Sequence, residues 1–211
     1  YKKPSVRWLI GLYDAFGSIF RRKKAPAKVS RPQRICFIAL HQIGDVVMTL
    51  PTIDAIQTMV PEAELSLIIG KGPASLLTDN RWGAKLYIFD AAWQKVVRQF
   101  SGQATNQIAA AKQRLLDRLN QINPDVVVVF HPDVVVNQLL GRTTIPHTFS
   151  FTNAGGGFWT THPVAMPQAG HQVERDYALA QALAETFHAR RPPLTRPHLE
   201  TNLVTRDKVT A

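Results

Sequence analysis

The sequence predicts an α/β fold in which helices cover a parallel sheet. Short apolar runs suited to buried strands alternate along the chain with longer segments of helical periodicity. The run PDVVVVFH at 124–131 is β-branched and apolar on both faces, as expected for a central parallel strand. Strands that alternate with helices are joined by right-handed crossovers, and ligands of such sheets bind beyond the carboxyl ends of the strands. The loops to inspect for a site are therefore 41–45, 70–75, 90–95 and 131–133.

The expected elements begin at residue 34. The strand candidates are RICFIAL at 34–40, ELSLIIG at 64–70, AKLYIFD at 84–90, the run at 124–131 and HTFSF at 147–151. The helix candidates are 45–59, 106–122 and 174–189, with a short helix within 71–80 and another opening over 133–140. The glycine-rich stretch AGGGF at 154–158 is interpreted as a flexible loop in preference to a phosphate cradle.

The charge of the chain is concentrated at one end. The net charge is +10, and residues 1–34 hold ten Lys and Arg against a single acid, Asp14. The remaining residues hold fifteen Lys and Arg against fourteen acids and are nearly neutral. A nucleic-acid-binding domain is expected to spread its basic residues over a folded face, so this distribution disfavours that class. The one cysteine, Cys36, lies in an apolar run and is expected in the core.

The basic N-terminal segment is predicted to form an amphipathic helix. Apolar residues recur at steps of three and four at Val6, Leu9, Tyr13, Phe16 and Phe20. The apolar part is too short to span a bilayer, and a basic helix with aromatic residues suits an anionic membrane surface, here through residues 4–24. Packing on the body of the protein, the tail of an upstream element and a signal peptide are the alternatives. Residues up to 33 complete this segment as a linker.

Several common site motifs are missing from the sequence. The loop after the first strand, in RICFIALHQIGDVVMTLP at 34–51, has neither G-x-G-x-x-G nor G-K-[ST], which disfavours a nucleotide-binding oxidoreductase. No H-x-x-x-H or H-E-x-x-H occurs among the seven histidines, so no metal site is predicted. The serine-hydrolase motif G-x-S-x-G is absent as well.

Three blocks of sequence, in the correct order, resemble the lipopolysaccharide heptosyltransferases, which are ADP-heptose-dependent glycosyltransferases. They are FIALHQIGDVVMTLPTIDAIQTMVPEAELSLII at 37–69, NPDVVVVFHPD at 123–133 and THPVAMPQAGHQVERDYAL at 161–179. The resemblance implies a GT-B fold of two facing Rossmann-like domains. It implies that 34–190 form the N-terminal, acceptor-binding domain, and that 191–211 begin the interdomain linker. We expect no donor domain in this chain, and hence no activity of this fragment alone.

The resemblance also implies an activity. The expected reaction is inverting transfer of a sugar from a nucleotide-sugar such as ADP-heptose to a lipopolysaccharide core or related glycan. Asp45 would be the general base that takes the proton of the acceptor hydroxyl. Gly44 would allow a sharp turn and a close approach of the acceptor. From local sequence alone, an ordinary N-cap is the alternative for Asp45.

Further acceptor-binding candidates are His41, Gln42 and Arg142. His41 and Gln42 stand where the family often has Ser or Thr, and His41 is interpreted either as a contact to an anionic sugar or as a surface loop residue. Arg142 is a candidate for binding an acceptor carboxylate or phosphate, with a solvated side chain as the alternative. His171, Glu174 and Arg175 are expected to be structural.

The expected partners are a lipid-linked glycan acceptor and a membrane surface, with no nucleic acid, at a cytoplasmic location peripheral to the inner membrane. No cofactor is expected besides the donor substrate, whose site would lie in the other domain. A non-catalytic membrane-associated interaction module derived from the same domain is the competing interpretation.

Overall fold

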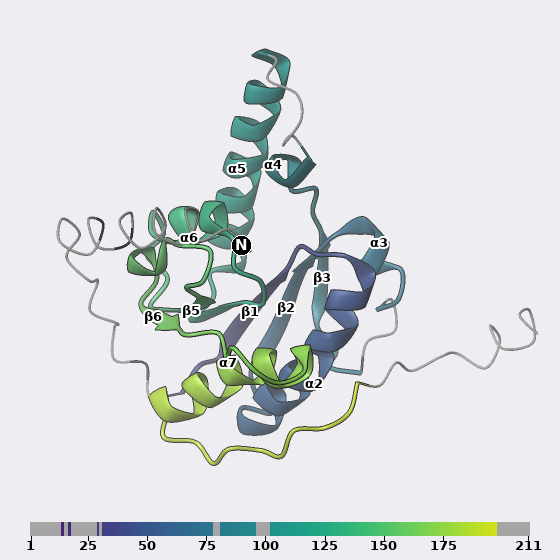
Figure 1. Cartoon of the computed structure of the whole chain (residues 1–211), viewed down its shortest axis with the longest axis vertical. Coiled ribbons are helices and arrows are strands. Elements are labelled where there is room, and N and C mark those ends of the chain that lie inside the picture. The colour runs from purple at the N-terminus through teal and green to yellow at the C-terminus, as the bar shows by residue number, and fades with distance from the viewer. Residues whose placement is uncertain are drawn as a thin grey trace, which may run out of the picture.

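The computed structural model describes residues 31–77, 81–95 and 102–197, together with residues 14, 17 and 29. Its centre is a six-stranded parallel sheet of order β3-β2-β1-β4-β5-β6 (Figure 1). The strands are β1 (Arg34–Ala39), β2 (Glu64–Ile69), β3 (Lys85–Ile88), β4 (Val126–Val129), β5 (His147–Phe151) and β6 (His162–Val164). The predicted Rossmann-like parallel sheet is confirmed.

The order in which the chain adds strands to the sheet reverses between the two central strands, β1 and β4. From β1 the chain proceeds outward through β2 to β3, then returns to place β4 on the other side of β1 and proceeds to β6. Phe37 of β1 is in register with Leu67 on one side and with Val128 on the other. Such a reversal leaves a crevice at the carboxyl ends of the two central strands, which is where open α/β sheets bind ligands.

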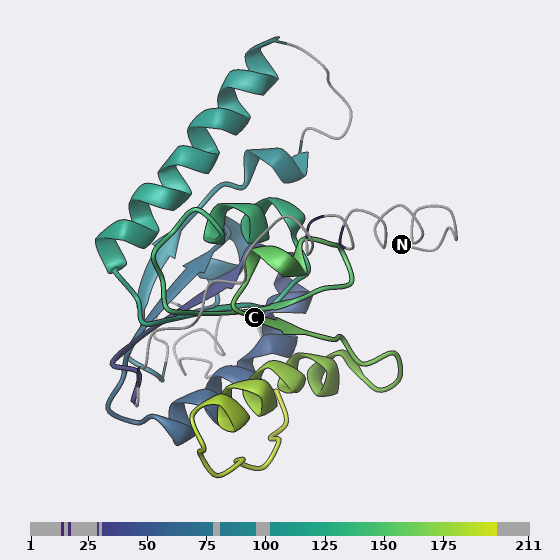
Figure 2. The same ribbon diagram turned by 90° about the vertical axis from the view of Figure 1, so that its left-hand side faces the viewer.

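Helices cover both faces of the sheet (Figure 2). On one face lie α2 (Ile43–Met59) and α7 (Gln172–Thr186), and on the other lie α5 (Gly102–Ile122) and α6 (Val134–Leu140). The short elements are α3 (Lys71–Ala74), α4 (Ala92–Lys95) and the 3₁₀ helix η1 (Gly157–Trp159). The result is a three-layer arrangement with a core on each side of the sheet.

The two cores follow from the alternation of side chains along the strands. Ile35, Phe37 and Ala39 of β1 face the cluster that includes α2 and α7. Cys36 and Ile38 face the cluster that includes α5 and α6. All five side chains are at most 1% exposed, because a central parallel strand is covered on both faces. Cys36 is therefore a core residue, as expected.

The structure differs from the sequence-based expectation in the starts of two helices, in three additional elements and in one loop. Helix α2 begins at Ile43, two residues before the expected start, and α5 begins at Gly102. The elements β6, α4 and η1 were not expected. The stretch Ala154–Phe158 is not an open flexible loop: its glycines are buried, and Gly157 opens η1.

Two expectations for the ends of the chain lie largely outside the described residues. Residues 14 and 17 are helical, while the rest of the predicted N-terminal helix and residues 198–211 are not described. Residues 191–197 have no regular secondary structure. None of the helices in the described ranges is long and apolar enough to cross a membrane.

Candidate functional site

The candidate site lies where β1 and β4 end, at the reversal of strand order. The chain leaves β1 through Leu40–Gln42 and enters α2, and it leaves β4 through residues 130–133 and enters α6. Because parallel strands end at one edge of the sheet, these two loops lie next to each other although some 90 positions separate them in sequence. The predicted residues His41, Gln42, Gly44 and Asp45 are all at this edge.

Asp45 is the third residue of α2 and is exposed. The N-cap of this helix is Gln42, so the interpretation of Asp45 as an ordinary N-cap is wrong. A carboxylate in the first turn of a helix is stabilised in its charged form by the helix dipole. The charge of Asp45 acts on two neighbours, raising the pKa of both His131 and Asp176 relative to what burial alone would set. The charge of Asp45 thus affects ionisable groups on two other elements, the loop after β4 and α7.

Gly44 precedes Asp45 in the first turn of α2. A side chain added at this position would meet no atom within 4 Å, so the space beside it is open. Gly44 is helical and its φ is not among the positive values found in the described residues, so its backbone conformation does not require glycine. What remains of the expectation is the room for a ligand to approach the backbone.

His41 packs edge-on against His131, with 3.7 Å between the ring centroids. Burial, and secondly the neighbouring His131, lower the pKa of His41 to about 3. His41 is half-buried in the loop after β1, and its buried Nε2 atom has no hydrogen-bond partner among the described residues. A neutral imidazole offers hydrogen bonds to a sugar but no positive charge to a carboxylate.

His131 and Asp133 come from the loop after β4, and neither was singled out from the sequence. Burial lowers the pKa of His131, while the charges of Asp45 and Asp133 act in the opposite direction. Asp133 caps α6: its Oδ1 accepts hydrogen bonds from the backbone N–H groups of Val135 (2.8 Å) and Val136 (3.2 Å). Its Oδ2 accepts from Trp93 Nε1 (2.9 Å) and Gln94 Nε2 (3.2 Å), which ties α4 to the site.

Asp176 is a second carboxyl group, brought to Asp45 by α7. It is 1% exposed and accepts a 2.8 Å hydrogen bond from Gln172 Nε2. Burial is the main cause that raises the pKa of Asp176 to about 7, with the charge of Asp45 adding to the increase. The site therefore pairs an exposed carboxyl group with a buried one whose pKa is raised to about 7, an arrangement that suits acid–base chemistry.

The start of α7 is held by a capping box. Glu174 Oε2 accepts a 2.9 Å hydrogen bond from the backbone N–H of His171, and His171 Nδ1 accepts one of 3.4 Å from Val173 N–H. Arg175 donates to the carbonyl oxygen of Gln168 (3.2 Å). The structural role expected for His171 and Glu174 is thereby supplied by helix capping.

Arg142 is not brought together with the other predicted residues. It is exposed and follows the C-cap of α6, whereas Asp133 marks the beginning of that helix. Since α6 returns the chain to the amino-terminal edge of the sheet before β5, Arg142 lies at the edge opposite Asp45. Within the described ranges, no group of three or more His, Cys, Asp or Glu residues is placed to hold a metal ion.

Fold and site together define a Rossmann-like α/β domain with a carboxylate at its topological switch point. No protein-family model and no curated protein matches the chain. Solved structures do. E. coli heptosyltransferase WaaC with ADP-2-deoxy-2-fluoro heptose has a TM-score of 0.57 and 18% identity, over 77% of this chain and 51% of that one. The glycosyl transferase family 9 protein from Veillonella parvula DSM 2008 has a TM-score of 0.66 and 14% identity, over 89% and 50%.

A third similar structure is E. coli ADP-heptose lps heptosyltransferase II, with a TM-score of 0.59 and 17% identity, over 83% of this chain and 49% of that one. The chain spans about half the length of these proteins. At these identities the likeness shows the fold, and the expected resemblance to heptosyltransferases is confirmed at that level.

Proposed function

We propose that this chain is the acceptor-binding domain of an inverting glycosyltransferase of the heptosyltransferase type, with Asp45 as its general base. The observation that carries the proposal is the position of Asp45: exposed, in the first turn of α2, at the carboxyl ends of the two central strands. The similar solved structures are glycosyltransferases, which supports the same class.

The proposed chemistry needs a base and a way to orient the acceptor. As the acceptor hydroxyl attacks the anomeric carbon of the donor sugar, its proton passes to the Asp45 carboxylate and the bond to the nucleotide diphosphate breaks. The open space beside Gly44 lets the sugar approach the loop. Gln42 is exposed beside this space and offers hydrogen bonds to an acceptor hydroxyl, whereas the neutral ring of His41 would have to turn outward to present its buried Nε2 atom.

The partners follow from the same proposal. The donor is a nucleotide-sugar such as ADP-heptose, bound outside this domain, and the acceptor is a lipid-linked glycan of the lipopolysaccharide core type. A lipid-linked acceptor places the protein at the cytoplasmic face of the inner membrane, and the basic amphipathic pattern of residues 4–24 suits an anionic lipid surface. The domain would thus work peripherally on the membrane that carries its acceptor.

The test is a transfer assay on the complete reading frame that contains this segment, with ADP-heptose and a panel of lipid A–Kdo acceptors. Asp45→Asn should reduce turnover by about 10²-fold or more, because the amide cannot accept the proton. Asp117→Asn, which changes an exposed acid on α5, is the matched control and should leave turnover unchanged. A folded Asp45→Asn variant that keeps most of its turnover would refute the role of Asp45.

The competing interpretation has its own outcome in this assay. A folded wild-type protein that transfers no sugar from any nucleotide donor, yet still binds anionic vesicles, would favour the non-catalytic membrane-associated module.

A further inference from the structure

The N-terminal segment contacts the domain at two described residues. Asp14 Oδ1 accepts a 2.7 Å hydrogen bond from the backbone N–H of Gly156. Three residues later, Gly17 lies against Phe158: a side chain at position 17 would come within 2.2 Å of Cε1 of that ring. Two helical residues, Asp14 and Gly17, thus meet one short stretch on the domain by a polar and an apolar contact.

The stretch on the domain is shaped for this contact and is firmly held. Gly155 and Gly156 have φ values of +85° and +79°, a left-handed conformation that turns the Gly156 N–H toward Asp14. The carbonyl oxygen of Gly155 accepts a 3.3 Å hydrogen bond from Asn137 Nδ2 of α6. A side chain at Gly156 would come within 3.3 Å of Val134. The left-handed conformation therefore favours glycine at both positions, and at Gly156 the tight packing against Val134 favours it too.

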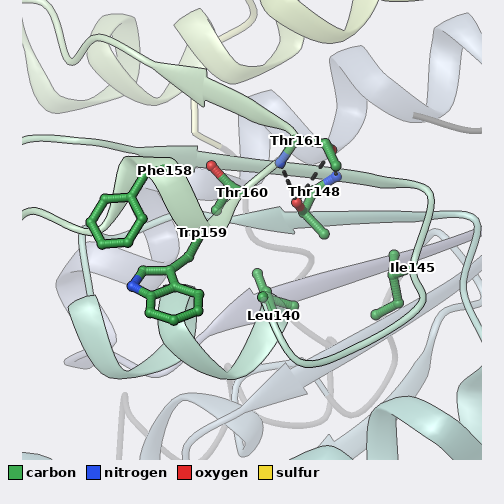
Figure 3. Close-up of a pocket in the computed structure, with 8 residues that line it drawn as sticks. Leu140, Ile145, Thr148, Phe158, Trp159, Thr160 and Thr161 are labelled. Carbon is green, nitrogen blue, oxygen red and sulfur yellow. Dashed lines mark hydrogen bonds between the residues drawn. The ribbon is translucent and has the colours of Figure 1, made fainter. Parts of the chain in front are cut away.

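Phe158 and Trp159 follow the glycines, and their side chains point in different directions (Figure 3). Trp159 points toward α6, whereas Phe158 points away from Leu140 and is the ring that Gly17 meets. The two rings lie 5.1 Å apart between centroids. Trp159 anchors the turn on the domain, and Phe158 presents an apolar surface to the N-terminal segment.

Asp14 differs in charge from the other ionisable residues of the N-terminal segment. Asp14 is the only acid among residues 1–34, which carry ten Lys and Arg. In the amphipathic pattern it interrupts the apolar part, and the structure gives it a partner. A carboxylate that accepts from a backbone N–H is a charge-assisted hydrogen bond, which is among the stronger kinds.

We propose that Asp14 and Gly17 form an intramolecular latch on the stretch Gly155–Phe158, which ties the N-terminal segment to the domain at the connection between β5 and β6. The stretch lies in the connection that crosses from β5 to the parallel strand β6, and its Phe158 lines a small pocket together with Leu140 and Gly141 at the end of α6. The helix that holds Gly155 through Asn137 is the helix capped by Asp133 of the candidate site.

The latch has a consequence that rests on the proposed function. A basic segment that is bound to an anionic lipid surface and tied to the domain by the latch would hold the domain, and with it the proposed acceptor site, in one orientation on the membrane. Without the latch, the segment would bind the membrane but leave the domain free to rotate on its linker.

The first experiment measures hydrogen exchange of the Gly156 amide by NMR in the 211-residue chain, without any substrate. Asp14→Ala should accelerate this exchange about tenfold, because it removes a charge-assisted hydrogen bond. Gly17→Leu should accelerate it too, and adding Phe158→Ala to Gly17→Leu should restore part of the protection by giving the leucine room. Unchanged exchange in both Asp14→Ala and Gly17→Leu overturns the latch. The amide of Val128 in β4 must stay protected throughout, which shows that the domain is folded.

The second experiment tests orientation on vesicles of phosphatidylglycerol and phosphatidylcholine that carry a lipid-bound quencher. A fluorophore is attached at Gln42→Cys or at Thr144→Cys, both exposed and at opposite edges of the sheet, while the buried Cys36 stays unlabelled. The two labels should be quenched to different extents if the latch fixes one orientation, and Asp14→Ala should abolish the difference. Equal quenching in the unaltered chain overturns the orientation, and failure to bind the vesicles contradicts the proposed membrane contact; the exchange experiment decides the latch independently of both.

Discussion

The imidazole rings of His41 and His131 meet edge-on at the ends of the two central strands, with 3.7 Å between their centroids. Two causes disfavour a positive charge on His41: burial lowers its pKa first, and His131 lowers it further, to about 3. We expect His41 to stay neutral at every pH at which an enzyme of this kind would work, so it would contribute hydrogen bonds and no charge to a bound sugar.

This state can be measured by NMR titration of the imidazole groups. His41 should show no protonation step near pH 6.5, and His131→Gln should raise the pKa of His41 because it removes one of the two causes of the decrease. His188→Asn, at an exposed position with φ of +51° that asparagine tolerates, is the control and should leave His41 unchanged. A His41 that titrates near its usual value would show that the pair does not form.

Asp176 makes the stability of the domain dependent on pH in the opposite sense from an ordinary carboxylate. Its pKa is raised from 3.8 to about 7, mainly by burial, with Asp45 adding to the increase and Gln172 and Arg175 opposing it. The folded state therefore holds this proton after the unfolded state has released it. The contribution to stability is fully present below about pH 4 and is lost as the pH rises to about 7, by roughly 4 kcal/mol at most.

Asp176→Asn should remove this loss. Urea unfolding at pH 5 and pH 8 should show that the variant gains stability relative to the unaltered chain as the pH rises, since the amide has no proton to release. Asp117→Asn, on the exposed face of α5, should show no such gain. A difference between Asp176→Asn and the unaltered chain that is the same at both pH values would contradict a raised pKa at Asp176.

Much of the fold follows from local sequence. The strands β1, β2 and β4 are short apolar runs with no helical period, and the helices α5 and α7 repeat their apolar residues at steps of three and four. Strand β6 gave no such signal, because it has three residues and contains Pro163, which lacks a backbone N–H. It is a strand because β5 offers it an edge, which is a tertiary cause.

The candidate site was only partly predictable. Asp45 was found through the resemblance of its surroundings to a family, and the loop at 131–133 was marked by its place after a strand. The contact of His41 with His131 depends on β1 and β4 being neighbours, and a single sequence does not fix strand order. For Asp176 a signal existed, because it falls in phase with the buried Val173, Ala180 and Leu183 on one face of α7. An acid on an apolar stripe is a candidate for a perturbed carboxyl group.

The pair His147 and His162 should make the domain sensitive to acid. His147 Nδ1 and His162 Nε2 lie 2.8 Å apart, and the ring of His162 stacks on Phe149 with centroids 4.4 Å apart. Burial, and then His147, lower the pKa of His162 to about 4. Because the unfolded state takes up this proton near pH 6.5 and the folded state only near pH 4, stability should fall as the pH falls through this interval.

His162→Gln should flatten the acid side of the stability curve between pH 6.5 and pH 4, since glutamine does not titrate. His188→Asn is again the matched control, and it should leave the slope as it is. If the slope of stability against pH in this interval is the same in His162→Gln as in the unaltered chain, the pair does not account for acid sensitivity.

Asp125 connects the beginnings of the two central strands by hydrogen bonds. It should contribute more to the free energy of unfolding than an ordinary surface acid does. Its Oδ2 accepts hydrogen bonds from the backbone N–H groups of Gln33 (2.8 Å) and Arg34 (2.9 Å), where β1 begins. Asp125→Ala leaves both donors without this acceptor and should cost about 2 kcal/mol in the free energy of unfolding. Asp125→Asn keeps a neutral acceptor in place and should cost about half as much, so urea unfolding should rank the unaltered chain first, the asparagine variant second and the alanine variant last. Equal stability of Asp125→Ala and the control Asp117→Ala would show that the first residues of β1 do not depend on this carboxylate.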